Sequence, residues 1–204
     1  MNILLFITAA LLGLLAFFEP CTIATHTLFA VRAHAAVQVQ RRRALMLLIG
    51  ARALLLSLIF GIAATVGLEA LSTGTAMVML SVIGLVYLVS RSVYIPIPHL
   101  EFFRLLPQRD TLAQSLKLGL TLPACTLPLV LIVAVLSALT QQPLNAMLAG
   151  LLFAAMFTLP TVWGVTHGLG IQARAFLAQA AALSPYLTTL LLWSAAFTIW
   201  QIGV

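Results

Sequence analysis

Apolar runs separated by short polar or basic stretches make up most of this chain. The runs cover residues 3–31, 44–68, 76–90, 118–139, 143–165 and 186–204. A spanning helix needs ~20 residues to cross a hydrocarbon core of ~30 Å, so the pattern predicts six transmembrane helices. The polar segment 91–117 is too small to be a domain. We therefore expect one transmembrane domain over residues 1–204, with a short helix at 166–185 lying partly along the membrane interface.

Composition supports a membrane protein and gives it an orientation. Hydrophobic residues make up 63% of the chain and charged residues only 7%, too few to cover a water-exposed surface. The ten basic residues lie in or beside the links after the first, third and fifth runs, and the other two links have none. The positive-inside rule then puts those three links, including 91–117, in the cytoplasm and both termini outside. The net charge of +6 is explained by this placement, so we expect no nucleic-acid binding.

Prolines interrupt the first and fourth runs. The 29 residues of the first run contain Glu19, Pro20 and His26, and as one straight helix they would reach ~43 Å, well beyond the core. Proline cannot donate a backbone hydrogen bond and clashes with the preceding turn. Pro123 and Pro128 lie on either side of the cysteine in the fourth run. Both helices are therefore predicted to be kinked or broken beside a cysteine.

The chain has two cysteines, which occupy matching places in its two halves. A shift of 104 residues aligns Cys21 and the threonine after it with Cys125 and the threonine after it. Each half, about 1–95 and 112–204, contains three predicted spans, and an odd number of spans makes the halves inverted copies. Helical rise from the nearest basic residues puts both thiols ~12 to 16 Å inside the cytoplasmic rim. Both cysteines are thus predicted to lie near the midplane of the bilayer.

These features resemble the CcdA family, which is similar to the transmembrane domain of DsbD. Pro20-Cys21 in the first helix, and Cys125 with Pro128 in the fourth, fit the family's pattern of a proline beside each cysteine. The resemblance implies a multi-pass protein of the bacterial inner (cytoplasmic) membrane. It further implies that the protein passes reducing equivalents from cytoplasmic thioredoxin to extracytoplasmic thioredoxin-like proteins, in cytochrome c maturation. No cofactor and no metal are implied.

Two positions depart from the family's pattern. Ala24 stands where the family usually has a proline three residues after the first cysteine, and Pro123 precedes Cys125 by two residues rather than one. The first departure predicts a first helix that is less broken than in the family. The chain also has no room for flanking soluble domains, which makes CcdA a nearer match than full-length DsbD.

Disulfide exchange assigns roles to four residues. Because Cys21 and Cys125 are expected at equal depth, we predict that they form one intramolecular disulfide when oxidised. The low dielectric of the membrane disfavours a thiolate, so exchange needs water or a neighbouring base, and Glu19 and His26 are the candidates. Other interpretations stay open: the cysteines as small buried side chains, Glu19 as a group that hydrates an outer vestibule, and His26 as a histidine packed against another helix.

A second function class also fits part of the pattern. In a small-solute or metal-ion transporter, the thiols, His26 and Glu19 would be ligands at a midplane site between broken helices. Redox use is favoured because a transporter site ordinarily needs more polar residues within the membrane. We expect Arg52 to snorkel to the cytoplasmic surface, and Gly164 with Gly168 to form a helix-packing pair.

Overall fold

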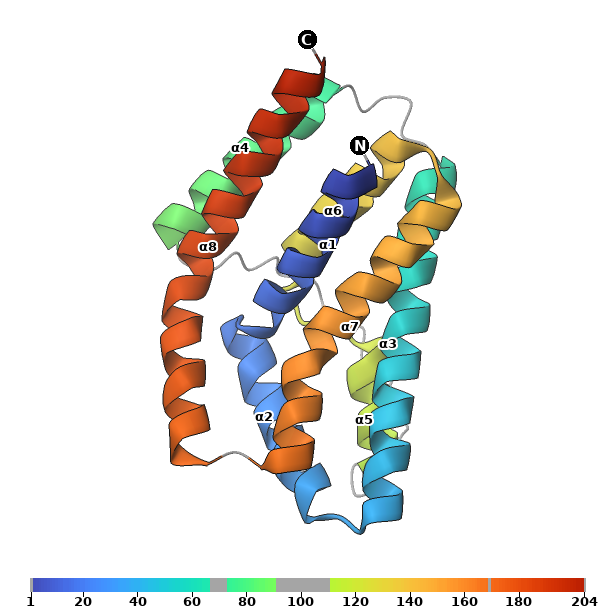
Figure 1. The fold of residues 1–204 in the computed structure, drawn as a ribbon, viewed down its shortest axis with the longest axis vertical. Helices are drawn as coiled ribbons and strands as arrows, with labels where there is room; N and C mark the ends of the chain where they lie inside the picture. Colours follow the sequence, from blue (N-terminus) through green and yellow to red (C-terminus); the bar gives the residue numbers. More distant parts are fainter. Residues whose placement is uncertain (1, 67–72, 91–110, 169, 204) are drawn as a thin grey trace.

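The chain folds as an all-helical protein in the part that the structure describes. The computed structural model describes residues 2–66, 73–90, 111–168 and 170–203. Its helices are α1 (Asn2–Phe17), α2 (Pro20–Ala35), α3 (Gln38–Val66), α4 (Thr73–Ser90), α5 (Thr111–Leu120), α6 (Leu127–Thr140), α7 (Pro143–His167) and α8 (Ile171–Gly203) (Figure 1). The prediction of an all-α protein is confirmed, and no strand occurs within these ranges.

Several of these helices fit a lipid bilayer. Helices α3, α7 and α8 are long and apolar enough to span a membrane, and the pair α1–α2 makes a fourth candidate if it counts as one bent span. Helices α4 and α6 are apolar but shorter. The N-terminus lies at the end of the bundle that carries the link between α6 and α7 (Figure 1), where the Asn2 side-chain amide donates to Gln142 Oε1 at 3.1 Å.

The first apolar run is broken sharply rather than gently. Helix α1 ends at Phe17, α2 begins at Pro20, and their axes differ by 72°. Proline suits the first position of a helix because that N–H has no partner inside the helix anyway. The chain therefore begins a new helix at Pro20 instead of bending an existing one. The alanine at position 24 does not keep this helix straight.

The fourth run is also divided, and its helical part begins earlier than expected. Helix α5 begins at Thr111 and ends at Leu120, and α6 begins at Leu127. The non-helical link between them holds Pro123, and Pro128 lies in the first turn of α6. The prediction that residues 111–117 belong to a polar loop is wrong, because they form most of α5. The remainder of that loop, 91–110, lies outside the described residues.

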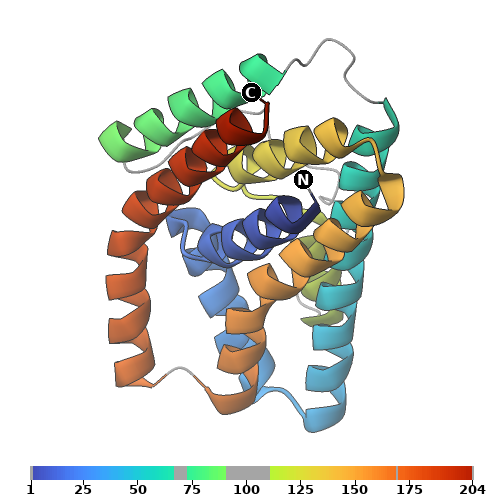
Figure 2. The same ribbon diagram turned by 45° about the horizontal axis from the view of Figure 1, so that its top comes forward.

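The core forms where α1, α3, α6 and α7 meet (Figure 2). Phe153 of α7 makes edge-to-face contacts with Phe60 and Phe157, at ring-centroid distances of 5.9 and 6.1 Å. Glycines let the helix backbones come close. A Cβ at Gly150 would lie 2.7 Å from a backbone oxygen of α3, and one at Gly13 would lie 2.5 Å from a backbone oxygen of α7. Such small-residue contacts are typical of helix packing in membranes.

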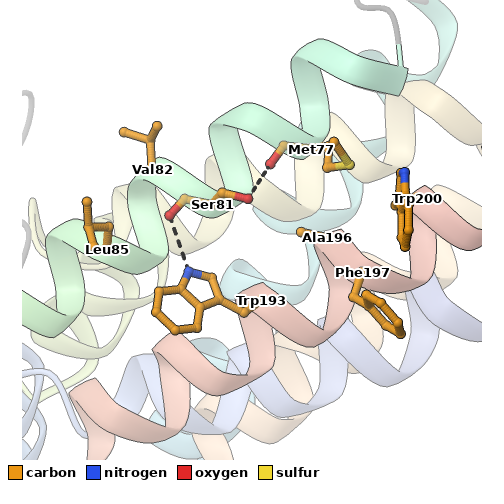
Figure 3. A pocket seen from close by; sticks show the side chains of 8 residues that line it. All are labelled: Met77, Ser81, Val82, Leu85, Trp193, Ala196, Phe197 and Trp200. Carbon is orange, nitrogen blue, oxygen red and sulfur yellow. Dashed lines mark hydrogen bonds between the residues drawn. The ribbon is translucent and has the colours of Figure 1, made fainter.

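Helices α4 and α8 form a separate pair along one side of the bundle (Figures 1 and 2). The Trp193 indole N–H donates to the Ser81 carbonyl at 3.3 Å (Figure 3). The Thr189 hydroxyl donates to the Gly84 carbonyl at 3.0 Å. A side chain at position 84 would collide with the indole nitrogen at 2.8 Å, so this glycine admits the tryptophan. One turn later, the same face of α4 presents Tyr87 to the interior.

Two features of the C-terminal third differ from expectation. Residues 171–185 are not a separate short helix, because α8 continues through Pro185 to Gly203. Its two halves run in different directions (Figure 1), as expected where a proline removes a hydrogen bond and displaces a carbonyl. Gly168 lies just beyond the end of α7, so it does not share one helix face with Gly164, although a Cβ at position 168 would lie 3.4 Å from the His34 ring of α2. It ends α7 with a positive φ of 78°, and its N–H donates to the Gly164 carbonyl at 3.0 Å.

Candidate functional site

The two cysteines meet where both broken helices are interrupted. Cys21 and Cys125 form an intramolecular disulfide with a Cα–Cα distance of 6.9 Å, as expected from their matching depths. Cys21 lies in the first turn of α2, and Cys125 lies two residues before α6. Each sulfur therefore belongs to the N-terminal end of a half-helix. Cys21 is exposed, whereas only 3% of Cys125 is accessible, so the two sides of the bond differ.

The prolines shape the ends of these half-helices. Pro20 is the first residue of α2, and the first hydrogen bond inside this helix runs from the Ile23 N–H to the Glu19 carbonyl at 2.9 Å. On the other side, Pro123 turns the chain before Cys125, since its carbonyl accepts from the N–H and the hydroxyl of Thr126 at 2.9 and 2.8 Å. The prolines predicted to break helices 1 and 4 thus lie at the two breaks.

Glu19 lies buried beside the disulfide. It precedes Cys21 by two residues and is only 2% accessible, and neither of its carboxyl oxygens makes a hydrogen bond with another described residue. Its polar neighbour is Tyr87 of α4, which is fully buried. The Tyr87 hydroxyl donates to the carbonyl of Cys125 at 3.4 Å. Tyr87 therefore lies between the carboxyl group of one half and the cysteine of the other.

Sequence reasoning missed Tyr87. Within the third apolar run it carries a polar group at the end of an otherwise apolar side chain, and a buried tyrosine hydroxyl ordinarily needs a partner. That signal marks it as a residue of interest. It does not identify the partner, because the contact depends on α4 packing beside the break between α5 and α6.

His26 is packed in the protein interior. Its ring lies between those of Phe17 and Phe157, at centroid distances of 5.8 and 5.5 Å. Arg52 Nη1 donates to His26 Nε2 at 2.8 Å. Because a guanidinium can only donate, Nε2 accepts, and the ring proton lies on Nδ1, which donates to the Thr22 carbonyl at 3.0 Å. Both ring nitrogens are thus engaged, as in a structural histidine.

Arg52 does not snorkel to the cytoplasmic surface, and that prediction is wrong. Its side chain is fully buried, and Nη2 donates to the carbonyl of Leu118 at 2.5 Å. The guanidinium carbon lies 4.2 Å from the centre of the Phe157 ring. Arg52 on α3 thus joins α2, α5 and α7. A cation beside the C-terminal end of α5 also interacts favourably with the helix dipole.

Most of the residues suggested above as metal ligands have other partners in this structure. No group of three or more His, Cys, Asp or Glu side chains gathers in the part of the chain that the structure describes. The two thiols are joined to each other, and both nitrogens of His26 have partners. The proposed ligand set of a transporter is therefore not assembled in this structure.

In comparisons with known proteins, no family model, curated protein or solved structure matches this chain. Its function must therefore be inferred from the residues of the site. Those residues are a disulfide between two half-helix ends, a buried carboxyl group and a buried tyrosine.

Proposed function

We propose that this protein is a CcdA-like thiol-disulfide oxidoreductase of the bacterial inner membrane. In this proposal, Cys21 and Cys125 alternate between a disulfide and two thiols. Cytoplasmic thioredoxin reduces the pair, and an extracytoplasmic thioredoxin-like protein oxidises it, with cytochrome c maturation as the task served. Two electrons cross the membrane for each cycle, and no cofactor takes part.

The observation that carries this proposal is the Cys21–Cys125 disulfide between two broken helices. The cysteines are 104 residues apart, and each comes from the helix break of a different half of the chain. Helix N-termini favour a thiolate because their N–H groups point outward and the helix dipole attracts negative charge. Both sulfurs therefore lie where a charged intermediate is least costly within an apolar protein.

The order of helices supports the proposed six-span architecture. A broken pair followed by two longer helices occurs twice, as α1–α2 with α3 and α4, and as α5–α6 with α7 and α8. Pairings also correspond between the halves: α1 and α2 both pack against α7, and α5 and α6 both pack against α3. We propose that these are inverted halves, with both termini outside and the link of residues 91–110 in the cytoplasm.

Exchange begins when a thiolate attacks one sulfur of the disulfide. The difference in exposure favours Cys21 as the sulfur attacked, because Cys125 is almost completely covered. The attack joins the partner to Cys21 and releases Cys125 as a thiolate. A second thiol of the partner then attacks the mixed disulfide and leaves both cysteines reduced. In this scheme Glu19 handles protons, while His26 is a supporting residue.

The proposal is tested by the redox state of the two cysteines in membranes. Free thiols are alkylated before and after addition of reduced thioredoxin, and the labelled positions are identified by mass spectrometry. We expect the oxidised protein to gain two labels, at Cys21 and Cys125, and the thioredoxin to become oxidised in equal amount. If the disulfide persists with reduced thioredoxin in excess, the proposed electron donor is wrong.

A further inference from the structure

The release of Cys125 creates a proton requirement that the disulfide alone does not meet. When Cys21 is attacked, the bond between the sulfurs breaks and Cys125 keeps the electron pair as a thiolate. Only 3% of Cys125 is accessible, so water reaches it poorly. The helix N-terminus lowers the cost of a thiolate there, but a buried charge is still costlier than a neutral thiol, and a proton supplied by the protein would remove it.

Glu19 is equipped to supply this proton. Its carboxyl group is 2% accessible, with no hydrogen bond to either oxygen among the described residues. An ionised carboxylate without a partner would be very costly there, so the group is expected to carry a proton. Among the residues that the structure describes, Arg52 and His26 are buried but hydrogen-bonded to each other, and Tyr87 is the ionisable side chain next to Glu19.

Tyr87 connects this carboxyl group to the residue that needs the proton. It is fully buried, it neighbours Glu19, and its hydroxyl already contacts Cys125 through the carbonyl oxygen of that residue. A phenol can accept a proton while it donates another. Tyr87 comes from α4, so a third segment lines the site in addition to the two broken helices, α1–α2 and α5–α6.

We infer that Glu19 is the acid for the Cys125 thiolate and that Tyr87 relays the proton from Glu19 to the sulfur. This inference rests on the proposed function and adds the proton route to it. As Cys125 leaves, Tyr87 gives its hydroxyl proton to the sulfur and takes the proton of Glu19. The Glu19 carboxylate is then reprotonated by water. This proton replaces the one that the attacking thiol released to the solvent when it ionised. When the partner's second thiol then releases Cys21, the proton of that thiol passes to Cys21, so complete reduction moves two electrons and two protons onto the pair.

The test measures how fast the disulfide is reduced by dithiothreitol, which makes no specific protein contacts. The purified chain in lipid nanodiscs is mixed with the reagent and quenched with an alkylating agent, and free thiols are counted by mass. General acids typically contribute ~10²- to 10⁴-fold. We expect Tyr87→Phe and Glu19→Gln each to slow reduction by about 10²-fold or more. The control Tyr186→Phe removes a hydroxyl from an exposed tyrosine and should leave the rate unchanged.

Two further measurements separate a proton route from a merely structural role. When two groups act as a unit, the effects of substituting them on the rate are not additive. The double variant Glu19→Gln/Tyr87→Phe should therefore be no slower than the slower single variant. Glu19→Asp keeps the acid and should recover part of the rate. The infrared spectrum of the oxidised protein should contain a carboxylic acid band that Glu19→Gln removes and Tyr87→Phe shifts.

Each outcome bears on the inference. Wild-type rates in Tyr87→Phe, or a double variant slowed by the product of the two single effects, would overturn it. If Tyr87→Phe does not fold, an unaltered rate in Glu19→Gln overturns it equally. If the variants behave as expected with dithiothreitol but reduced thioredoxin fails to reduce the wild-type protein, the proton route stands and the proposed physiological donor fails.

Discussion

Arg52 provides a sharp test of how the two broken helices are held together. Its guanidinium donates to His26 of α2 and to Leu118 of α5, and it lies over the ring of Phe157. The substitution Arg52→Lys keeps the charge and most of the aliphatic stem. A single ammonium cannot reproduce the planar fork that reaches two acceptors while stacking on a ring. The variant therefore loses the two-acceptor hydrogen bonding and the ring stacking, while the charge stays unchanged.

The expected cost of Arg52→Lys follows from the contacts that it loses. One hydrogen bond from a charged group contributes ~1.5–3 kcal/mol, and a desolvated cation–π contact contributes up to ~2 kcal/mol. The lysine ammonium is also more strongly hydrated than a guanidinium, so burying it does not compensate for the lost hydrogen bond and ring contact. We expect the free energy of unfolding to fall by about 2–4 kcal/mol. A surface arginine that snorkels would lose almost nothing, because lysine snorkels equally well.

The assay is reversible unfolding in mixed micelles as the fraction of a denaturing detergent rises, followed by circular dichroism. Arg42→Lys is the matched control, since Arg42 lies on the same helix and is exposed; substitutions of that kind usually stay within ~0.5 kcal/mol. The disulfide is left intact in every variant. An Arg52→Lys protein that unfolds within ~0.5 kcal/mol of the wild type would show that Arg52 does not join α2 to α5.

Three further predictions concern the order of exchange, the topology and the packing. Cys125→Ala, incubated with a thioredoxin that lacks its second cysteine, should form a reducible cross-link at Cys21, and Cys21→Ala should form much less; equal yields would remove the assigned order. A reporter fused after Val204 should be active outside the cytoplasm, and cytoplasmic activity would reject the orientation. Gly150→Ala forces a Cβ to 2.7 Å from the backbone of α3 and should cost ~1–3 kcal/mol in detergent unfolding. Gly50→Ala meets open space and should not destabilise, whereas an equal loss in both would contradict the packing argument.

Local signals in the sequence predict much of the helical pattern. The run at 143–165 becomes α7 (Pro143–His167), because a proline suits the first helical position and little interrupts the apolar stretch that follows. The run at 44–68 becomes α3 (Gln38–Val66), extended at its start by polar residues that hydropathy alone does not assign to a span. The meeting of Cys21 and Cys125 is a long-range contact that the sequence nevertheless predicts, because the repeat and the estimated depths put the two residues at matching positions in the two halves.

The errors come from contacts between distant segments. Arg52 looks like a snorkelling residue until α2 and α5 supply acceptors on either side of it. Tyr87 looks like one more residue of an apolar span until the break before α6 presents a carbonyl to it. Each partner lies more than 25 residues away, beyond the reach of periodicity or spacing. Even an accurate assignment of helices leaves such pairs undetermined.

The helix breaks and the disulfide depend on each other physically. A continuous helix satisfies its N–H groups internally and offers none to a thiolate in its middle. Beginning a new helix at Pro20, and another at Leu127, leaves N–H groups without helical partners in the first turns, which lie at or next to the two cysteines in the chain. Such helix ends are tolerated within a bilayer only where protein or water surrounds them, and the packing of α4 and α7 around the two breaks provides this surrounding. The breaks thus place a polar environment at the two positions where exchange would create a charge.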